Sequence, residues 1–423
     1  MRHHALSALL AASTALTFVA PAQAQSLDAV VEATLARSPD LAAARARADA
    51  ASARVDQARA ERMPSASVQG QVGVGRIDPQ GFFGLNADAV TPRALQFGTE
   101  LPLYTGGRIG AAIGQARAGE AAAQASTAMS TLSLRIDVVR TYAEAVAARD
   151  AAAAYGRMET ALTEAVRQAR LKYETGAGTS TDMALAEARL AEAQAARATA
   201  EGEQAAARAG LRALAGMDVA LDERLPVSPL PDLSMQAAIA RARANNPGIA
   251  AARAMVHAAR GGVSGARAER LPTLGAYAEA ASVRDQFFPG YRADSASVGV
   301  RARWTLFDGG RAGAKVREAE ADLAERSAQL AAAEQEVERR TAGAYAALIG
   351  ADRALVAARA RREASDTALR SVRLEVRAGA QPMLALLDAE RDAAAAAADE
   401  TRAMARRLVQ SEALAALLGG QVG

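Results

Sequence analysis

Four short segments in the first half of the chain return in the second half, in the same order and with similar sequences. They are SPDLAAAR at 38–45 and NPGIAAAR at 246–253, ARAERMP at 58–64 and ARAERLP at 266–272, LYTGGR at 103–108 and LFDGGR at 306–311, and TGA at 175–177 and AGA at 378–380. The first two pairs are 208 residues apart and the last two are 203 apart. Two copies without a third indicate a duplicated structural unit, not a solenoid.

The duplication predicts the domain organisation. Residues 25–216 form a first repeat and residues 247–423 a second. The segment 217–246 contains prolines at 226, 229 and 231, and we expect it to be a linker that lies outside the helical array.

The first 24 residues have the features of a secretory signal peptide. Arg2 precedes an apolar stretch, and Ala22-Gln23-Ala24 supplies a cleavage site of the small-x-small type. No later apolar run has the roughly 18 residues that a membrane-spanning helix needs. The chain also lacks cysteine, so no residue is available for lipidation after cleavage. We expect an exported protein without an acyl anchor.

Each repeat contains two segments in which apolar and polar residues alternate, the pattern of half-exposed strands. The first repeat has them near 67–74 and 94–103, and the second near 273–280 and 297–306. In the last segment the apolar set is Val298, Val300, Ala302, Trp304 and Leu306. Strands of about ten residues are long enough to cross a bilayer when tilted.

A Gly-Gly pair then ends the second strand of each repeat and precedes a very long helical pattern. The two long helices are predicted at 108–174 and 311–377, and at 1.5 Å per residue each extends for about 100 Å. Shorter helices are predicted at 40–62, 180–216, 248–270 and 382–418. Heptad spacing, as in Val316, Leu323, Leu330 and Val337, predicts that the long helices supercoil against their neighbours.

The composition excludes most enzyme classes. With no cysteine, and with His257 as the one histidine after the leader, the chain cannot build a Cys nucleophile or a Cys/His zinc site. No nucleotide-binding glycine motif is present. The 50 basic and 47 acidic residues alternate along helices, which indicates a solvated or ion-paired surface and no nucleic-acid partner. We expect no enzyme, no cofactor and no metal site.

Four strands cannot close a barrel, and an open sheet edge is not tolerated in lipid, so several chains must pool their strands. Together with the leader, the duplication and the strand-to-helix motifs LYTGGR and LFDGGR, this organisation resembles the TolC family of outer-membrane efflux and secretion channels. The resemblance implies an α plus transmembrane β fold and a homotrimer. Each chain would give four strands to a twelve-stranded barrel in outer-membrane lipid, and long helices to an α-helical barrel in the periplasm.

The same resemblance implies a function and partners. The trimer would be the passive exit duct of a drug-efflux pump or a type I secretion system of a Gram-negative cell. It would meet a periplasmic adaptor protein and an inner-membrane pump of the RND or ABC type at two helical hairpin tips. The residues assigned to these tips are Tyr173, Gly176, Gly178, Val376, Gly379 and Gln381, and those assigned to the strand-to-helix turns are Gly106, Gly107, Gly309 and Gly310.

A periplasmic gate is implied at Asp182 and Asp388, which stand six and nine residues after the turn glycines of their hairpins. A carboxylate at a water-filled constriction favours cations. Ala385 replaces one of the two acids of the family's second hairpin, and Val376 and Gln381 stand where Tyr and Arg are common. The alternative is that both aspartates simply stabilise the first turns of their helices.

Other strand residues keep two interpretations. Trp304 and Tyr104 fit either an interfacial aromatic belt or packing at the strand-to-helix corner. Arg301 and Arg303 share a polar face that could line the lumen or pair with Glu100 or Glu279. An alternative to the whole assignment is a secreted periplasmic coiled-coil adaptor or scaffold, but it leaves the alternating strands unexplained. The cargo is not readable from the sequence.

Overall fold

The computed structural model describes residues 26–78, 88–222, 224–226 and 229–420, so the predicted signal peptide lies outside the described residues. The elements in chain order are α1 (Leu27–Arg37), α2 (Pro39–Ala60), β1 (Ser65–Val72), β2 (Gly75–Ile77), β3 (Asp88–Val90), β4 (Arg93–Tyr104), α3 (Arg108–Glu174), α4 (Ser180–Ala215), α5 (Met235–Asn245), α6 (Pro247–Ala268), β5 (Thr273–Arg284), β6 (Arg292–Arg303), α7 (Arg311–Arg377) and α8 (Met383–Leu417).

The chain divides into two compact units, and each unit contains parts of both repeats. Of the described residues, the first unit comprises 26–36, 138–222, 224–226 and 358–405, and the second comprises 37–78, 88–137, 229–357 and 406–420. The long helices α3 and α7 continue from one unit into the other without a break. The compact units therefore do not coincide with the predicted repeats.

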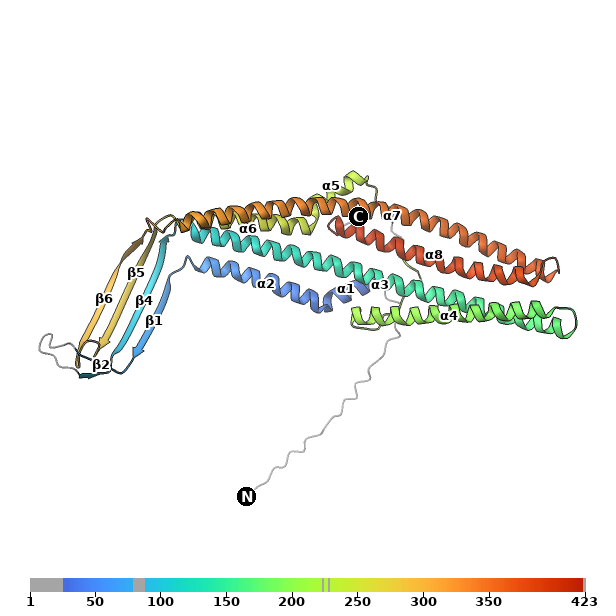
Figure 1. Cartoon of the computed structure of the whole chain (residues 1–423), viewed down its shortest axis with the longest axis horizontal. Helices are drawn as coiled ribbons and strands as arrows, with labels where there is room; N and C mark the ends of the chain where they lie inside the picture. Colours follow the sequence, from blue (N-terminus) through green and yellow to red (C-terminus); the bar gives the residue numbers. More distant parts are fainter. Residues whose placement is uncertain (1–25, 79–87, 223, 227–228, 421–423) are drawn as a thin grey trace, which may run out of the picture. The chain divides into compact units, whose positions relative to one another are not determined.

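The second unit contains an antiparallel sheet with the strand order β1-β4-β5-β6 (Figure 1). The register brings Val68 opposite Phe97, Phe97 opposite Ala280 and Ala276 opposite Val300, so one face of the sheet carries an apolar band across all four strands. On this face Val72 is 73% exposed and Val300 is 61% exposed. A short hairpin of β2 and β3, which the alternation did not predict, forms a separate sheet.

Local signals explain where the shorter helices of this unit begin. Ser38 caps α2 by accepting a hydrogen bond from the Leu41 N–H, and Asn246 caps α6 by accepting one from the Gly248 N–H. A proline follows each cap at the first helical position, where its missing N–H costs nothing. In the same unit, Ala58 of α2 packs in one core cluster with Ile109 and Ile113 of α3.

The first unit is a bundle whose core is built largely from alanine. Along α4, Ala186, Ala193 and Ala200 are buried at intervals of seven, the spacing of a coiled-coil seam. They pack in two clusters with parts of α3 and α8, where Leu162 and Leu387 are the large buried side chains. Small seam residues let the helix backbones approach closely.

The structure corrects two expectations. The predicted linker contains a helix, α5, whose Ala238 and Ala242 are buried in a core cluster with residues of α6, α7 and α8. The last strand ends at Arg303, so Trp304 and Leu306 are not part of it. The Trp304 indole N–H instead donates to the Arg270 carbonyl at 3.1 Å, which favours the corner-packing interpretation of this residue.

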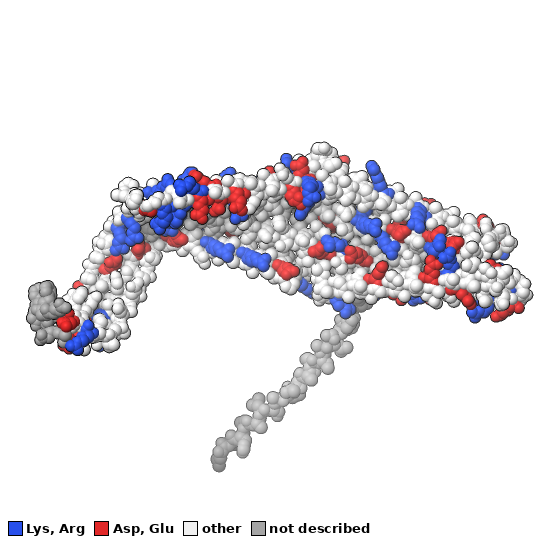
Figure 2. Space-filling model, in the orientation of Figure 1, with Lys and Arg blue, Asp and Glu red and all other residues white. Residues whose placement is uncertain are grey.

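The surface agrees with the sequence-based view of the charges. Basic and acidic side chains are interspersed over the helices on the face that Figure 2 shows, without a large area of one sign. Among the described residues, no helix has the length and apolar character needed to cross a membrane.

Candidate functional site

Two helix–turn–helix tips in the first unit carry most of the predicted site residues. The first tip joins α3 to α4. Gly176 has a φ of +73°, a left-handed conformation that glycine adopts without strain. The N–H groups of Ala177 and Gly178 donate to the Lys172 carbonyl at 2.8 and 2.9 Å, which satisfies the end of α3. Tyr173, in the last turn of α3, is exposed.

The second tip joins α7 to α8 with nearly the same backbone. Gly379 has a φ of +76°, and the Ala380 N–H donates to the Glu375 carbonyl at 2.8 Å. Val376 and Gln381 occupy the positions of Tyr173 and Gly178 of the first tip. A side chain is possible at 381, whereas a Cβ on Gly178 would lie 3.0 Å from the Lys172 Cβ. The two tips therefore share a turn but present different side chains.

Asp182 and Asp388 have different surroundings. Asp182 completes a capping box at the start of α4: its carboxylate accepts from the Thr179 hydroxyl at 2.8 Å, and its own N–H donates to that hydroxyl oxygen. Asp182 therefore lies in the first turn of α4, as the first-turn alternative predicts for it. Asp388 lies beyond the first turn of α8, because that helix begins at Met383, so the first-turn alternative is wrong for it.

Asp388 joins the two hairpins. Its Oδ1 accepts a hydrogen bond from Arg189 Nη2 of α4 at 3.1 Å, and Arg391 lies 3.8 Å away in its own helix. Arg189 also pairs with Glu192 at 2.8 Å, and this bond is the main cause of the raised pKa of its guanidinium. The two predicted gate residues are therefore not brought together. Asp388 instead meets an arginine from the other hairpin.

Sequence reasoning missed Arg189, although a signal was present. Arg189 lies three residues after Ala186, which places it beside the buried alanine seam of α4. A charged residue at the flank of a coiled-coil seam is positioned to pair with the neighbouring helix.

Within each hairpin an ion pair links the two helices at the same position of the repeat. Arg170 of α3 pairs with Glu187 of α4 at 3.1 Å, and Arg373 of α7 pairs with Glu390 of α8 at 2.6 Å. The first pair is exposed, whereas the Glu390 side chain is only 8% exposed and accepts two hydrogen bonds from Arg373. The duplication has thus produced one surface pair and one pair with a buried carboxylate.

The strand-to-helix corners lie in the second unit. Gly106, Gly107, Gly309 and Gly310 all have positive φ, between +62° and +88°. Asp308 caps α7, because its carboxylate accepts from the N–H groups of Ala312 at 2.7 Å and Gly310 at 3.0 Å. The hydrogen bond from Ala312 is the largest cause of the lowered pKa of Asp308.

The polar face of the sheet carries a small charged cluster. Arg301 pairs with Glu279 at 2.9 Å, and its guanidinium carbon lies 4.5 Å from the centre of the Tyr277 ring. These residues line a 180 Å³ depression together with Gln69, Gln96 and Glu100. Of the two partners considered for Arg301, the hydrogen bond goes to Glu279.

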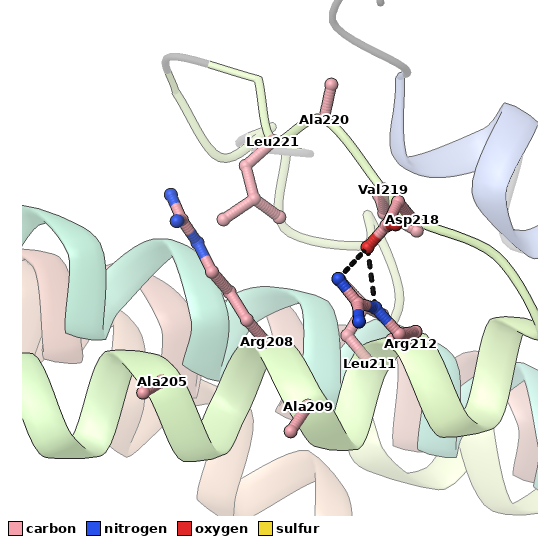
Figure 3. A pocket seen from close by; sticks show the side chains of 9 residues that line it. All are labelled: Ala205, Arg208, Ala209, Leu211, Arg212, Asp218, Val219, Ala220 and Leu221. Atoms are coloured by element: carbon pink, nitrogen blue, oxygen red, sulfur yellow. Dashed lines mark hydrogen bonds and ion pairs between the residues drawn. The ribbon is translucent and has the colours of Figure 1, made fainter.

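A further depression, of 450 Å³, lies at the end of α4 in the first unit (Figure 3). Arg208 and Leu221 border it, and the Arg212 Nε donates to Asp218 Oδ1 at 2.6 Å. Among the described residues, no group of three or more His, Asp or Glu side chains is arranged to hold a metal ion.

Comparison with known proteins gives a consistent result. The family model described as outer membrane efflux protein matches residues 30–217 and again residues 238–420. Protein CyaE of Bordetella pertussis is 33% identical over 333 residues, which cover 74% of this chain and 68% of CyaE. The alkaline protease secretion protein AprF of Pseudomonas aeruginosa is 33% identical over 194 residues, 44% of this chain and 40% of AprF.

Solved structures share the fold. The outer-membrane channel OprN superposes with a TM-score of 0.80 at 23% identity, and the match covers 93% of this chain and 90% of OprN. At this identity the likeness concerns the fold alone, and it extends over nearly all of the chain.

Proposed function

The chain belongs to the outer membrane efflux protein family, and we propose that three copies of it assemble into the exit duct of a tripartite efflux pump or a type I secretion system. It is an outer-membrane protein with the α-helical barrel and β fold of the TolC-like channels. The name of AprF, which refers to protease secretion, supports the secretion alternative, and the family description supports the efflux alternative.

The observation that carries the proposal is that the sheet has an exposed apolar face and two open edges. Its apolar face is exposed, with Val68 66% and Val298 85% accessible. Within the described sheet, β1 and β6 are edge strands. Exposed apolar faces and open edges fit a membrane only if further strands complete the barrel and lipid covers the apolar side. Other copies of the chain supply such strands.

The remaining elements have roles in the same scheme. Each copy of the chain has two repeats, 25–216 and 247–423, separated by 217–246. Each repeat contributes one pair of long strands and one helical hairpin. The tips around Gly176 and Gly379, with Tyr173, Gly178, Val376 and Gln381, would contact a periplasmic adaptor that couples the duct to an inner-membrane pump of the RND or ABC type. The duct itself performs no chemistry and recognises little, so the pump selects the cargo.

The test is to measure assembly and conductance on the same sample. We expect the protein purified from outer membranes in detergent to be a trimer by light scattering and to form ion-conducting channels in planar bilayers. A monomer without conductance, recovered from the soluble periplasmic fraction, would instead support the adaptor or scaffold alternative.

We further propose that Asp388 acts at the periplasmic gate through its ion pair with Arg189 of the other hairpin. Asp388→Asn removes a negative charge from the tip and weakens this link between α8 and α4. The expected result is a higher mean conductance and a lower preference for cations, measured in planar bilayers with a salt gradient.

Asp392→Asn is the matched control, because Asp392 lies one turn further along α8 and pairs with the neighbouring Arg391 at 3.2 Å. If both variants conduct like the parent protein, Asp388 has a structural role only. Asp182 is proposed as a second gate residue, but its capping box predicts that Asp182→Asn acts mainly by loosening the start of α4.

A further inference from the structure

The strand register repeats along with the sequence. Adding 208 to each residue of β1 and 203 to each residue of β4 converts the pairing of β1 with β4 into that of β5 with β6. Ser65 opposite Glu100 becomes Thr273 opposite Arg303, and Val68 opposite Phe97 becomes Ala276 opposite Val300. The offsets read from the sequence motifs therefore hold residue by residue in the sheet.

A second kind of contact joins the long second strand of the first repeat to the first strand of the second repeat. In the sheet this junction is the pairing of β4 with β5, where Phe97 is opposite Ala280. At the adjoining corner Gly106 faces the end of α6. A Cβ built on Gly106 would lie 2.7 Å from the Leu271 Cβ and 2.9 Å from the Ala268 carbonyl oxygen.

The equivalent surface of the second repeat has no such neighbour within the described chain. Gly309 has a φ of +68°, close to the +62° of Gly106, yet no described atom beyond its chain neighbours lies within 4 Å of a Cβ built there. Phe307, in the same corner, is 88% exposed. Met63, the residue of the first repeat that corresponds to Leu271 of the second, is also exposed.

We infer that the first repeat of a second copy of this chain occupies this surface, in the geometry of the internal junction. The offsets then specify the contact: β6 of one copy pairs antiparallel with β1 of the next, with Val300 opposite Val72, and Gly309 faces Met63. The inference rests on the proposed assembly and adds its residue-level register.

The register agrees with the two faces of the sheet. Val300 and Val72 both belong to the apolar face, and their neighbours Arg301 and Gln71 both belong to the polar face. A slip of one residue would bring the polar Gln71 onto the apolar face, opposite Val300. The transferred register therefore continues the apolar face from one copy to the next.

The test is disulfide trapping, which this cysteine-free chain makes clean. The double variant Val72→Cys/Val300→Cys is exported, purified in detergent and oxidised with copper phenanthroline. Opposed residues in an antiparallel pair are about 4.5–5.5 Å apart at Cα, within the range of a disulfide. We expect covalent dimers and trimers on non-reducing gels that return to monomers on reduction.

Two matched variants define the outcome. Phe97→Cys/Ala280→Cys places the same pair at the internal junction, so it should form a disulfide within one chain and give no ladder. Val72→Cys/Val298→Cys is displaced by two residues and should give far less cross-linking. A ladder from this slipped pair, or none from 72/300 in a sample that light scattering shows to be trimeric, overturns the register while the proposed duct stands. A sample that forms no trimer overturns both.

Discussion

Gly106→Ala is expected to destabilise the strand-to-helix corner far more than Gly107→Ala does. Both glycines have positive φ, so each substitution costs about 1–2 kcal/mol for placing an L-residue in the left-handed region. Only at Gly106 does the new methyl group also collide with the Leu271 side chain and the Ala268 carbonyl. Overpacking of this kind adds about 1–3 kcal/mol.

The single tryptophan provides the measurement. Trp304 donates to the carbonyl of Arg270, the residue before Leu271, so its fluorescence reports on the corner. Guanidinium unfolding of the detergent-solubilised protein should show a clearly lower midpoint for Gly106→Ala than for Gly107→Ala. The slope of the unfolding transition should be nearly the same for both variants and the parent protein. Equal midpoints for the two variants would contradict the close contact at Gly106.

The long helices were predictable because glycine punctuates them. Gly107 and Gly310 precede α3 and α7, and Gly176 and Gly379 follow them, so local backbone preference fixes both ends of each helix. The predicted bounds of 108–174 and 311–377 are those of the structure. The family and the channel fold were expected from a resemblance carried by the duplication and the LYTGGR and LFDGGR motifs, and the family model and the solved channel structures confirm them.

The end of the last strand was not predictable from its own pattern. The alternation continues through Trp304 and Leu306, but the partner strand β5 starts at Thr273, opposite Arg303. Pro272 precedes it and has no N–H to offer, so the ladder stops there. The helix α5 was not predicted, because three prolines dominate the composition of the preceding part of its segment. Its burial depends on residues of α7 and α8, which lie far away in the sequence.

The two candidate gate aspartates show a further limit. Both follow a turn glycine on a helix, and their spacing alone does not separate a cap from an interhelical partner. Thr179 makes Asp182 a capping residue, whereas Asp388 depends on Arg189, which is about 200 residues away in the sequence and adjacent in the bundle. Such pairings require tertiary structure.

The duplicated ion pairs give the second large effect. Arg373→Ala is expected to lower the free energy of unfolding by about 1–3 kcal/mol, because it leaves the largely buried Glu390 carboxylate without its half-exposed partner. Arg170→Ala removes the equivalent arginine of the first repeat, where Glu187 is hydrated, and should cost about 0–1 kcal/mol. Circular dichroism at 222 nm during denaturant unfolding measures both changes.

A double variant separates the lost partner from lost packing. Arg373→Met combined with Glu390→Leu removes both charges and fills the site with apolar groups, and such replacements of buried pairs are often neutral or stabilising. We therefore expect it to recover most of the stability that Arg373→Ala loses. If the double variant is as unstable as Arg373→Ala, or if Arg170→Ala costs as much, then the unpaired carboxylate is not the cause, and the hairpin depends on the arginine stems themselves.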